Sequence, residues 1–256
     1  MQPRDLLLAA LLLAGASPIA AQGRTQPFAI ADNSFLVEEA FNQEKGIFQN
    51  ILLFQRPNAG GWQMEFTQEW PVGGQTHQFS YTVPFADGGI GDLMLNWRVQ
   101  ARQEDATGPA ISPRLSVILP TGKDDSYQAG VQFNLPVSRQ FGDLYVHANG
   151  GGTLDRVELG ETHSLISPHA AVGLIYRAWP MVHVMAESVL RNEQTVSGLG
   201  KERETVFLVS PGVRAGLNLG SHQLVLGAAA PLTVAGPAGD AFLVYLSYEL
   251  PFTRNR

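Results

Sequence analysis

Residues 241–252 read AFLVYLSYELPF, and this stretch decides the fold. Alternate side chains of a β-strand point to opposite faces. One face here is entirely uncharged, from Phe242 to an aromatic end at Phe252, whereas the other carries Ser247 and Glu249. The length matches the roughly 9–11 residues of a tilted strand that crosses a bilayer. We therefore predict that 241–252 is the last strand of an outer-membrane β-barrel and closes it by pairing with the first strand. Residues 253–256 would then be a short tail.

The first 22 residues have the layout of a secretory signal peptide. Arg4 precedes an apolar run from Leu6 to Ala16, and small residues follow up to Ala21. This layout is typical of signals for export, and the run is too short for a membrane-spanning helix. We expect residues 1–22 to be removed; the alternative is a retained N-terminal anchor.

The composition narrows the class of protein. The chain has 256 residues, a net charge of −6 and no cysteine. An acidic balance argues against nucleic acid as a partner, and disulfides and thiolate metal sites are excluded. No later run approaches the roughly 20 apolar residues of a spanning helix. The 45% hydrophobic content is ordinary and by itself suggests a soluble protein. A barrel shows the same content, because lumen-facing polar residues dilute the apolar ones.

The same alternation recurs along the rest of the chain. It is clearest in 62–72, where Trp62, Met64, Phe66 and Trp70 alternate with polar residues. Tryptophans near both ends of a strand match the aromatic girdles of membrane barrels. Turn residues divide 46–252 into twelve such segments, with long polar loops expected at 155–162 and 192–202. We predict an all-β fold: a closed antiparallel up-and-down transmembrane barrel of about twelve strands.

A short helix is predicted ahead of the barrel, within residues 23–45. Asp32, Asn33 and Ser34 are good helix N-caps, and apolar residues from Phe35 onward recur at helical spacing. Gly46 would end the helix. Two placements remain open, a plug inside the pore and a cap packed on the periplasmic rim.

Charged side chains on the predicted strands fall opposite the apolar face. An arginine facing lipid near the middle of the bilayer would cost about 2–4 kcal/mol, so we expect these side chains, together with one histidine, to line the lumen. The predicted pore-lining residues are Glu65, Glu69, Asp92, Arg98, Arg102, Arg114, His147, Arg177, Glu187, Arg191, Arg214 and Glu249.

These lumen residues have two interpretations. Six arginines nearly balance five carboxylates, which differs from the ring of one sign that gives ion selectivity. Paired, they would form a salt-bridged network that fills and stiffens the interior. Alternatively, they would form a polar constriction that a solute passes.

A soluble barrel would have the opposite sense, apolar inside and charged outside. Alternation alone does not distinguish the two. The signal peptide, the aromatic residues at strand ends and the final strand favour the membrane barrel.

The sequence has little that indicates catalysis. It contains no HExxH, Walker loop or nucleophile elbow, and its six histidines lack metal-site spacing, so we predict no metal, no cofactor and no enzyme activity. A membrane-embedded hydrolase using His147 with a lumen serine such as Ser116 is the enzymatic alternative. It would need a third, orienting group that the sequence does not indicate.

Three regions resemble a known family. They are 31–44, with ADNSFLVEEA followed by NQE after one residue, then 119–124, LPTGKD, and 134–138, NLPVS. Each is similar to the bacterial outer-membrane transporter family associated with the meta-pathway of phenol degradation. The resemblance implies an outer-membrane barrel that passes aromatic or other apolar solutes, and it carries over no individual functional residue.

The sequence therefore predicts a passive channel for small solutes, with outer-membrane lipid and an unidentified small molecule as partners. The alternatives are a barrel with a structural role in the envelope and the hydrolase above.

Overall fold

The computed structural model describes residues 29–30, 32–124, 126–197, 200–220 and 222–252. The predicted signal peptide, residues 23–28 and the tail 253–256 lie outside the described residues.

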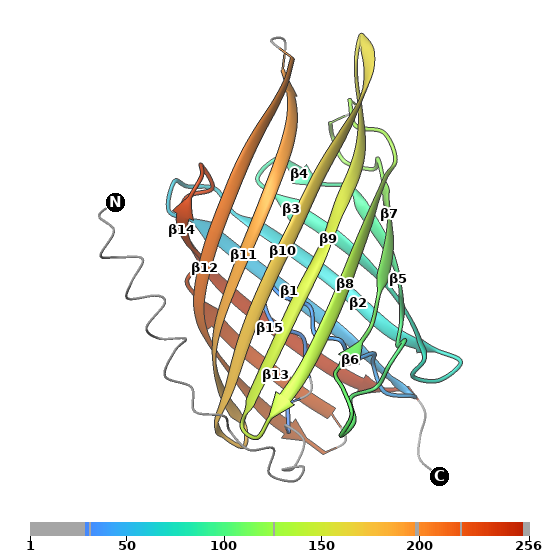
Figure 1. The fold of residues 1–256 in the computed structure, drawn as a ribbon, viewed down its shortest axis with the longest axis vertical. Coiled ribbons are helices and arrows are strands. Elements are labelled where there is room, and N and C mark those ends of the chain that lie inside the picture. The colour runs from blue at the N-terminus through green and yellow to red at the C-terminus, as the bar shows by residue number, and fades with distance from the viewer. Residues whose placement is uncertain (1–28, 31, 125, 198–199, 221, 253–256) are drawn as a thin grey trace.

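Twelve antiparallel strands form a closed wall (Figure 1). They are β1 (Ile47–Pro57), β2 (Gln63–Val72), β3 (His77–Ala86), β5 (Leu93–Val99), β7 (Arg114–Leu119), β8 (Gly130–Phe141), β9 (Leu144–Leu159), β10 (Glu161–Trp179), β11 (Val182–Ser197), β12 (Gly200–Leu219), β13 (His222–Ala229) and β15 (Ala241–Pro251). Three short strands attach to this wall: β4 (Gly89–Ile90) pairs with β3, β6 (Ala110–Ile111) with β8, and β14 (Leu232–Ala235) with β12.

The last strand closes the barrel against the first. β15 pairs with β1 from Ala241↔Pro57 to Pro251↔Ile47, and β11 pairs with β12 on the far side. This confirms the predicted twelve-stranded antiparallel barrel and its closing pair. A closed sheet leaves no unpaired edge, as hydrocarbon requires.

The two faces of the wall differ as the alternation predicted. On β15, Phe242 is 52% exposed, whereas Leu243 and Ser247 are each 0% exposed. Elsewhere, Trp97 is exposed and its neighbour Arg98 is buried. The exposed apolar side chains form an outer band that suits contact with lipid, and the charges are kept away from it.

Two hairpins are longer than predicted. The polar regions 155–162 and 192–202 are not loops: β9 pairs with β10 as far as Leu159↔Glu161, and β11 with β12 as far as Ser197↔Gly200. Strands of 16 to 20 residues exceed the roughly 9–11 that span a bilayer, so their ends project beyond it (Figure 1). A projecting hairpin meets water on both faces, so it lacks the apolar alternation used to recognise strands.

The predicted N-terminal helix is wrong: among the described residues none is helical. Residues 29–30 and 32–46, here called the lumen segment, form an irregular chain inside the barrel (Figure 1). The N–H groups of Leu36, Val37 and Glu38 bond to wall side chains instead of to carbonyls four residues earlier, as a helix needs. The described part of the chain has no helix with the length and apolarity needed to cross a membrane.

Candidate functional site

The lumen segment enters and leaves at the same end of the barrel. Near its start, Ala29 accepts a hydrogen bond from Gln223, at the beginning of β13. It ends at Gly46, whose carbonyl accepts from the N–H of Phe252 just before β1 begins. Gln223 is the ladder partner of Glu249, and Ile47 that of Pro251, so both points lie beside the end of β15. The segment therefore turns back within the lumen.

Wall side chains hold the main chain of the segment. Glu187 on β11 accepts from the N–H groups of Leu36 and Val37, at 2.9 and 3.0 Å. Asn149 on β9 accepts from the N–H of Glu38 and donates to its carbonyl, at 2.7 and 2.8 Å. Further ties come from Ser138, Gln100 and Gln78. For residues 30 and 32–43, no backbone-to-backbone hydrogen bond joins the segment to the wall.

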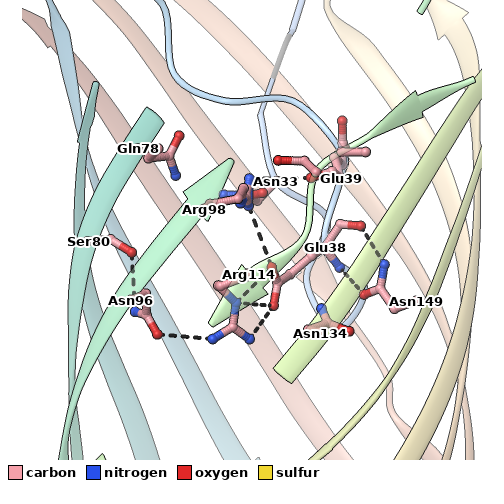
Figure 2. A network of polar contacts seen from close by, with 12 residues as sticks. Asn33, Glu38, Glu39, Gln78, Ser80, Asn96, Arg98, Arg114, Asn134 and Asn149 are labelled. Atoms are coloured by element: carbon pink, nitrogen blue, oxygen red, sulfur yellow. Dashed lines mark hydrogen bonds and ion pairs between the residues drawn. The ribbon is translucent and has the colours of Figure 1, made fainter. Parts of the chain in front are cut away.

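Glu38 is the centre of one charged network (Figure 2). Its carboxylate accepts from Arg114 on β7, from Nε at 2.9 and 3.0 Å and from Nη2 at 2.5 Å. Arg98 on β5 lies 3.6 Å away and also donates to the carbonyl of Phe41. Burial alone would raise the pKa of Glu38, but these two guanidinium groups outweigh it and lower the pKa to about 2. Glu38 is therefore ionised at neutral pH.

Arg214 on β12 makes a second charged anchor. It is 1% exposed, and its Nη1 donates to the carbonyls of Asp32 and Asn33 and to the Glu39 carboxylate, at 2.7, 2.9 and 3.2 Å. Asp32 also accepts from Tyr245 on β15 at 2.6 Å. Burial raises the pKa of both Asp32 and Glu39, although Arg214 acts in the opposite direction.

Glycines in the wall provide space for the apolar side chains of the segment. A Cβ added at Gly227 would lie 2.2 Å from the ring of Phe35, and one at Gly216 would lie 2.8 Å from Ile30. The Phe35 ring also packs 5.0 Å from that of Tyr245, centre to centre. The wall is therefore shaped to hold the segment, and larger residues at these glycines would collide with it.

Two cavities flank the lumen segment. The Asp32 cavity, about 410 Å³, is lined by Asp32, Glu39 and wall residues that include Glu69 and Glu249. The Glu38 cavity, about 180 Å³, is lined by Leu36 and Glu38 and by residues of β8 to β12. The cavities share no lining residue, and the segment contributes lining residues to both.

The structure places the predicted pore-lining residues in three groups. Buried against the lumen segment or beside its cavities are Glu69, Arg98, Arg114, His147, Glu187, Arg191, Arg214 and Glu249. Glu65 lies on the same face of β2 as Glu69 but is exposed. The remaining three are at the ends of the wall: Asp92, which accepts from the N–H of Gly122, Arg102 in the connection between β5 and β7, and Arg177, which pairs with Asp143.

One interpretation of the sequence paired the arginines of the strands with the carboxylates of the strands. The structure shows other partners. Each of the six arginines has an ion-pair partner outside the five predicted carboxylates: Glu38 for Arg98 and Arg114, Glu39 for Arg214, Asp105 for Arg102, Asp143 for Arg177 and Glu193 for Arg191. Acids of the lumen segment thus neutralise the three most enclosed arginines. The sequence signal for these pairs is the adjacent acidic pair Glu38 and Glu39, which lies within the stretch predicted to be a helix.

Neutral residues that hold the segment were also missed. These residues carry no charge, so the pattern of charged side chains on the strands does not identify them: Asn149, Gln100, Gln78 and Ser138. What they share is that each has an amide or hydroxyl side chain and lies on the inward face of the wall.

His147 does not meet Ser116, the partner considered for a hydrolase. Its Nδ1 lies 2.7 Å from the Ser138 hydroxyl, which accepts from the N–H of Ala40. Ser116 instead accepts from Arg114 and donates to Asn96. Both Ser138 and His147 are fully buried beneath the segment, so the pair serves as an anchor point. In the described residues, no three metal-ligating side chains converge.

No model of a known protein family matches the chain, and a search of curated proteins found no match. Among solved structures it is similar to the COG4313 outer membrane channel from Pseudomonas putida F1, with 12% identity, a TM-score of 0.59, and 88% of this chain and 99% of that chain covered. Weaker matches are the β domain of the Bordetella autotransporter BrkA, with 15% identity, a TM-score of 0.44 and coverage of 81% and 100%, and OpdK of Pseudomonas aeruginosa with vanillate, with 10% identity, a TM-score of 0.32 and coverage of 81% and 100%.

At 12% identity the first similarity concerns the fold alone. A closed twelve-stranded wall, an apolar outer band and charges turned inward are the features of a protein built for lipid surroundings. The chain is an outer-membrane β-barrel.

Proposed function

We propose that this barrel is a channel for small solutes, closed at rest by the lumen segment. The observation that carries the proposal is that two cavities flank the segment, whose described residues 30 and 32–43 are tied to the wall through side chains and not through a backbone ladder. A neutral hydrogen bond contributes about 0.5–1.5 kcal/mol and one to a charged group about 1.5–3 kcal/mol. None of these ties belongs to the ladders that close the wall, so displacing the segment leaves the wall pairing intact.

The proposed solutes are small and partly apolar or aromatic. The resemblance to the family associated with phenol degradation implies this class. The lining of the Glu38 cavity supports it, because Leu36, Val189 and Leu208 offer apolar contact beside polar groups. The lumen charges then provide a polar path along which such a solute passes.

Conductance in planar bilayers tests the proposal. In Gly227→Val the new side chain would collide with Phe35, so the segment should leave its seat and conductance should rise several-fold over wild type. Gly150→Val is the matched control, since a Cβ there meets nothing within 4 Å. Liposome swelling with benzyl alcohol and with glucose would compare apolar and polar solutes.

A structural role in the envelope is the second candidate, favoured by the many contacts that fill the lumen. It predicts no conductance in wild type, in Gly227→Val or after deletion of residues 30–43. That set of results, with each variant shown to be a folded barrel, would overturn the channel proposal.

A further inference from the structure

The Arg114 guanidinium is held by side chains of the wall as well as by Glu38 of the lumen segment. Its Nη1 donates to Asn96 on β5 at 3.0 Å, and its Nη2 donates to Gln132 on β8 at 2.8 Å. These contacts leave the Nε and Nη2 edge facing Glu38. This is the planar edge with which arginine binds a carboxylate in bidentate fashion. If Glu38 moved, the wall would keep presenting the same edge.

Glu38 is placed so that another carboxylate could replace it beside Arg114. Its side chain is 27% exposed and lines the Glu38 cavity, whereas that of its neighbour Glu39 is only 6% exposed. The main chain around Glu38 is tied to the wall by Asn149 and Glu187 rather than by a β-ladder. Exchange of one carboxylate for another at Arg114 would leave no guanidinium unpaired, which is the cost that normally protects an enclosed ion pair.

We propose that Arg114, assisted by Arg98, is a binding site for the carboxylate of a small amphipathic solute, and that Glu38 fills this site until the solute displaces it. The inference rests on the proposed channel function and adds to it a solute class and a trigger. Displacement removes the strongest charged contact at this point of the lumen segment and so favours its release.

The adjoining cavity sets the size and character of the solute. Its volume of about 180 Å³ compares with the roughly 150 Å³ cavity that accommodates benzene in another protein. Leu36, Ala171, Val189 and Leu208 line it with apolar surface, while Asn134 and His169 offer polar atoms. A solute with about one ring and one carboxylate would match both the apolar and the polar part of this lining.

Isothermal titration calorimetry on the mature protein in detergent tests the site with benzoate and with benzamide, its neutral analogue of similar shape. Glu38→Gln removes the competing charge and should bind benzoate at least tenfold more tightly than wild type does. Benzamide affinity should change less than twofold. Adding Arg114→Gln to Glu38→Gln should abolish the gain, and adding Arg98→Gln should reduce it.

The matched control is Glu161→Gln, which removes one negative charge at the tip of the β9–β10 hairpin and should bind benzoate as wild type does. Each variant is checked for a folded barrel by its heat-modifiable migration on gels. Equal benzoate affinity in wild type, Glu38→Gln and the Arg114 double variant would overturn the site. Equal gains for benzoate and benzamide would overturn the carboxylate specificity.

Calorimetry and conductance separate the two proposals. Benzoate binding that follows the predicted order, with no conductance in any variant, would support the site and overturn the channel. Conductance in Gly227→Val without any effect of Glu38→Gln on benzoate binding would support the channel and overturn the site.

Discussion

At the scale of single residues, the lumen is organised by groups that are costly to leave unpaired. Arg98, Arg114 and Arg214 project from the wall into an enclosed space, and acids and carbonyls of the lumen segment satisfy them. Removing one partner from such a pair costs more than the pair itself contributes, because an enclosed charge is left behind. The lumen segment therefore stabilises the closed state of the barrel.

Glu38→Gln should lower the free energy of unfolding by about 1–3 kcal/mol at pH 7, since Arg114 loses its charged partner. The effect should depend on pH in a defined direction. The pKa of Glu38 is lowered from 4.5 to about 2, so its stabilising contribution is fully present above pH 4.5 and is lost as the pH falls towards 2. Urea unfolding followed by tryptophan fluorescence would measure both. A deficit that persisted unchanged near pH 2 would contradict this account, and Glu161→Gln is the control.

Phe35 and Gly227 should be energetically coupled. Phe35→Ala leaves a void beside Tyr245 and should cost about 3–5 kcal/mol, as is typical of buried phenylalanines. Gly227→Val alone should destabilise through its collision with the ring. In the double variant the valine occupies the space that the ring vacates, so the combined loss should be smaller than the sum. A double-mutant cycle on unfolding free energies measures this, and strict additivity would argue against the contact.

At the scale of elements, the hairpins and the wall are separable. The wall strands must alternate because one face meets lipid, whereas the outer parts of β9 to β12 meet water on both faces and are stabilised by their ladders alone.

Replacing residues 195–202 with a two-residue Asn-Gly turn should leave the barrel intact, since Gln194 and Arg203 are ladder partners and can be joined directly. We expect the folded form on gels to resist heat as wild type does. Conductance should also match wild type. Loss of the folded form would show that the projecting hairpin contributes to the stability of the wall.

At the scale of the whole molecule, the distribution of apolar surface sets the environment. The band contains exposed Trp97, Leu115 and Leu246, with buried polar groups behind it. Leu246→Arg should therefore destabilise the barrel in phospholipid vesicles by about 2–4 kcal/mol if position 246 lies near the bilayer centre. Leu246→Met should have a much smaller effect. An arginine tolerated at no cost would place position 246 outside the hydrocarbon.

The sequence by itself determined the wall of this protein. Alternation in stretches such as 241–252 depends only on the period of a strand and on the contrast between lipid and lumen, so twelve strands and the closing pair could be read from it. The position of the lumen segment inside the barrel, by contrast, was decided by tertiary structure. Glu38 meets Arg114, and Phe35 meets Gly227, across large separations in the chain, and no local period encodes such pairs. For the same reason the helical spacing of residues 35–43 was misleading. N–H groups that would donate to main-chain carbonyls in a helix donate here to side chains of the wall.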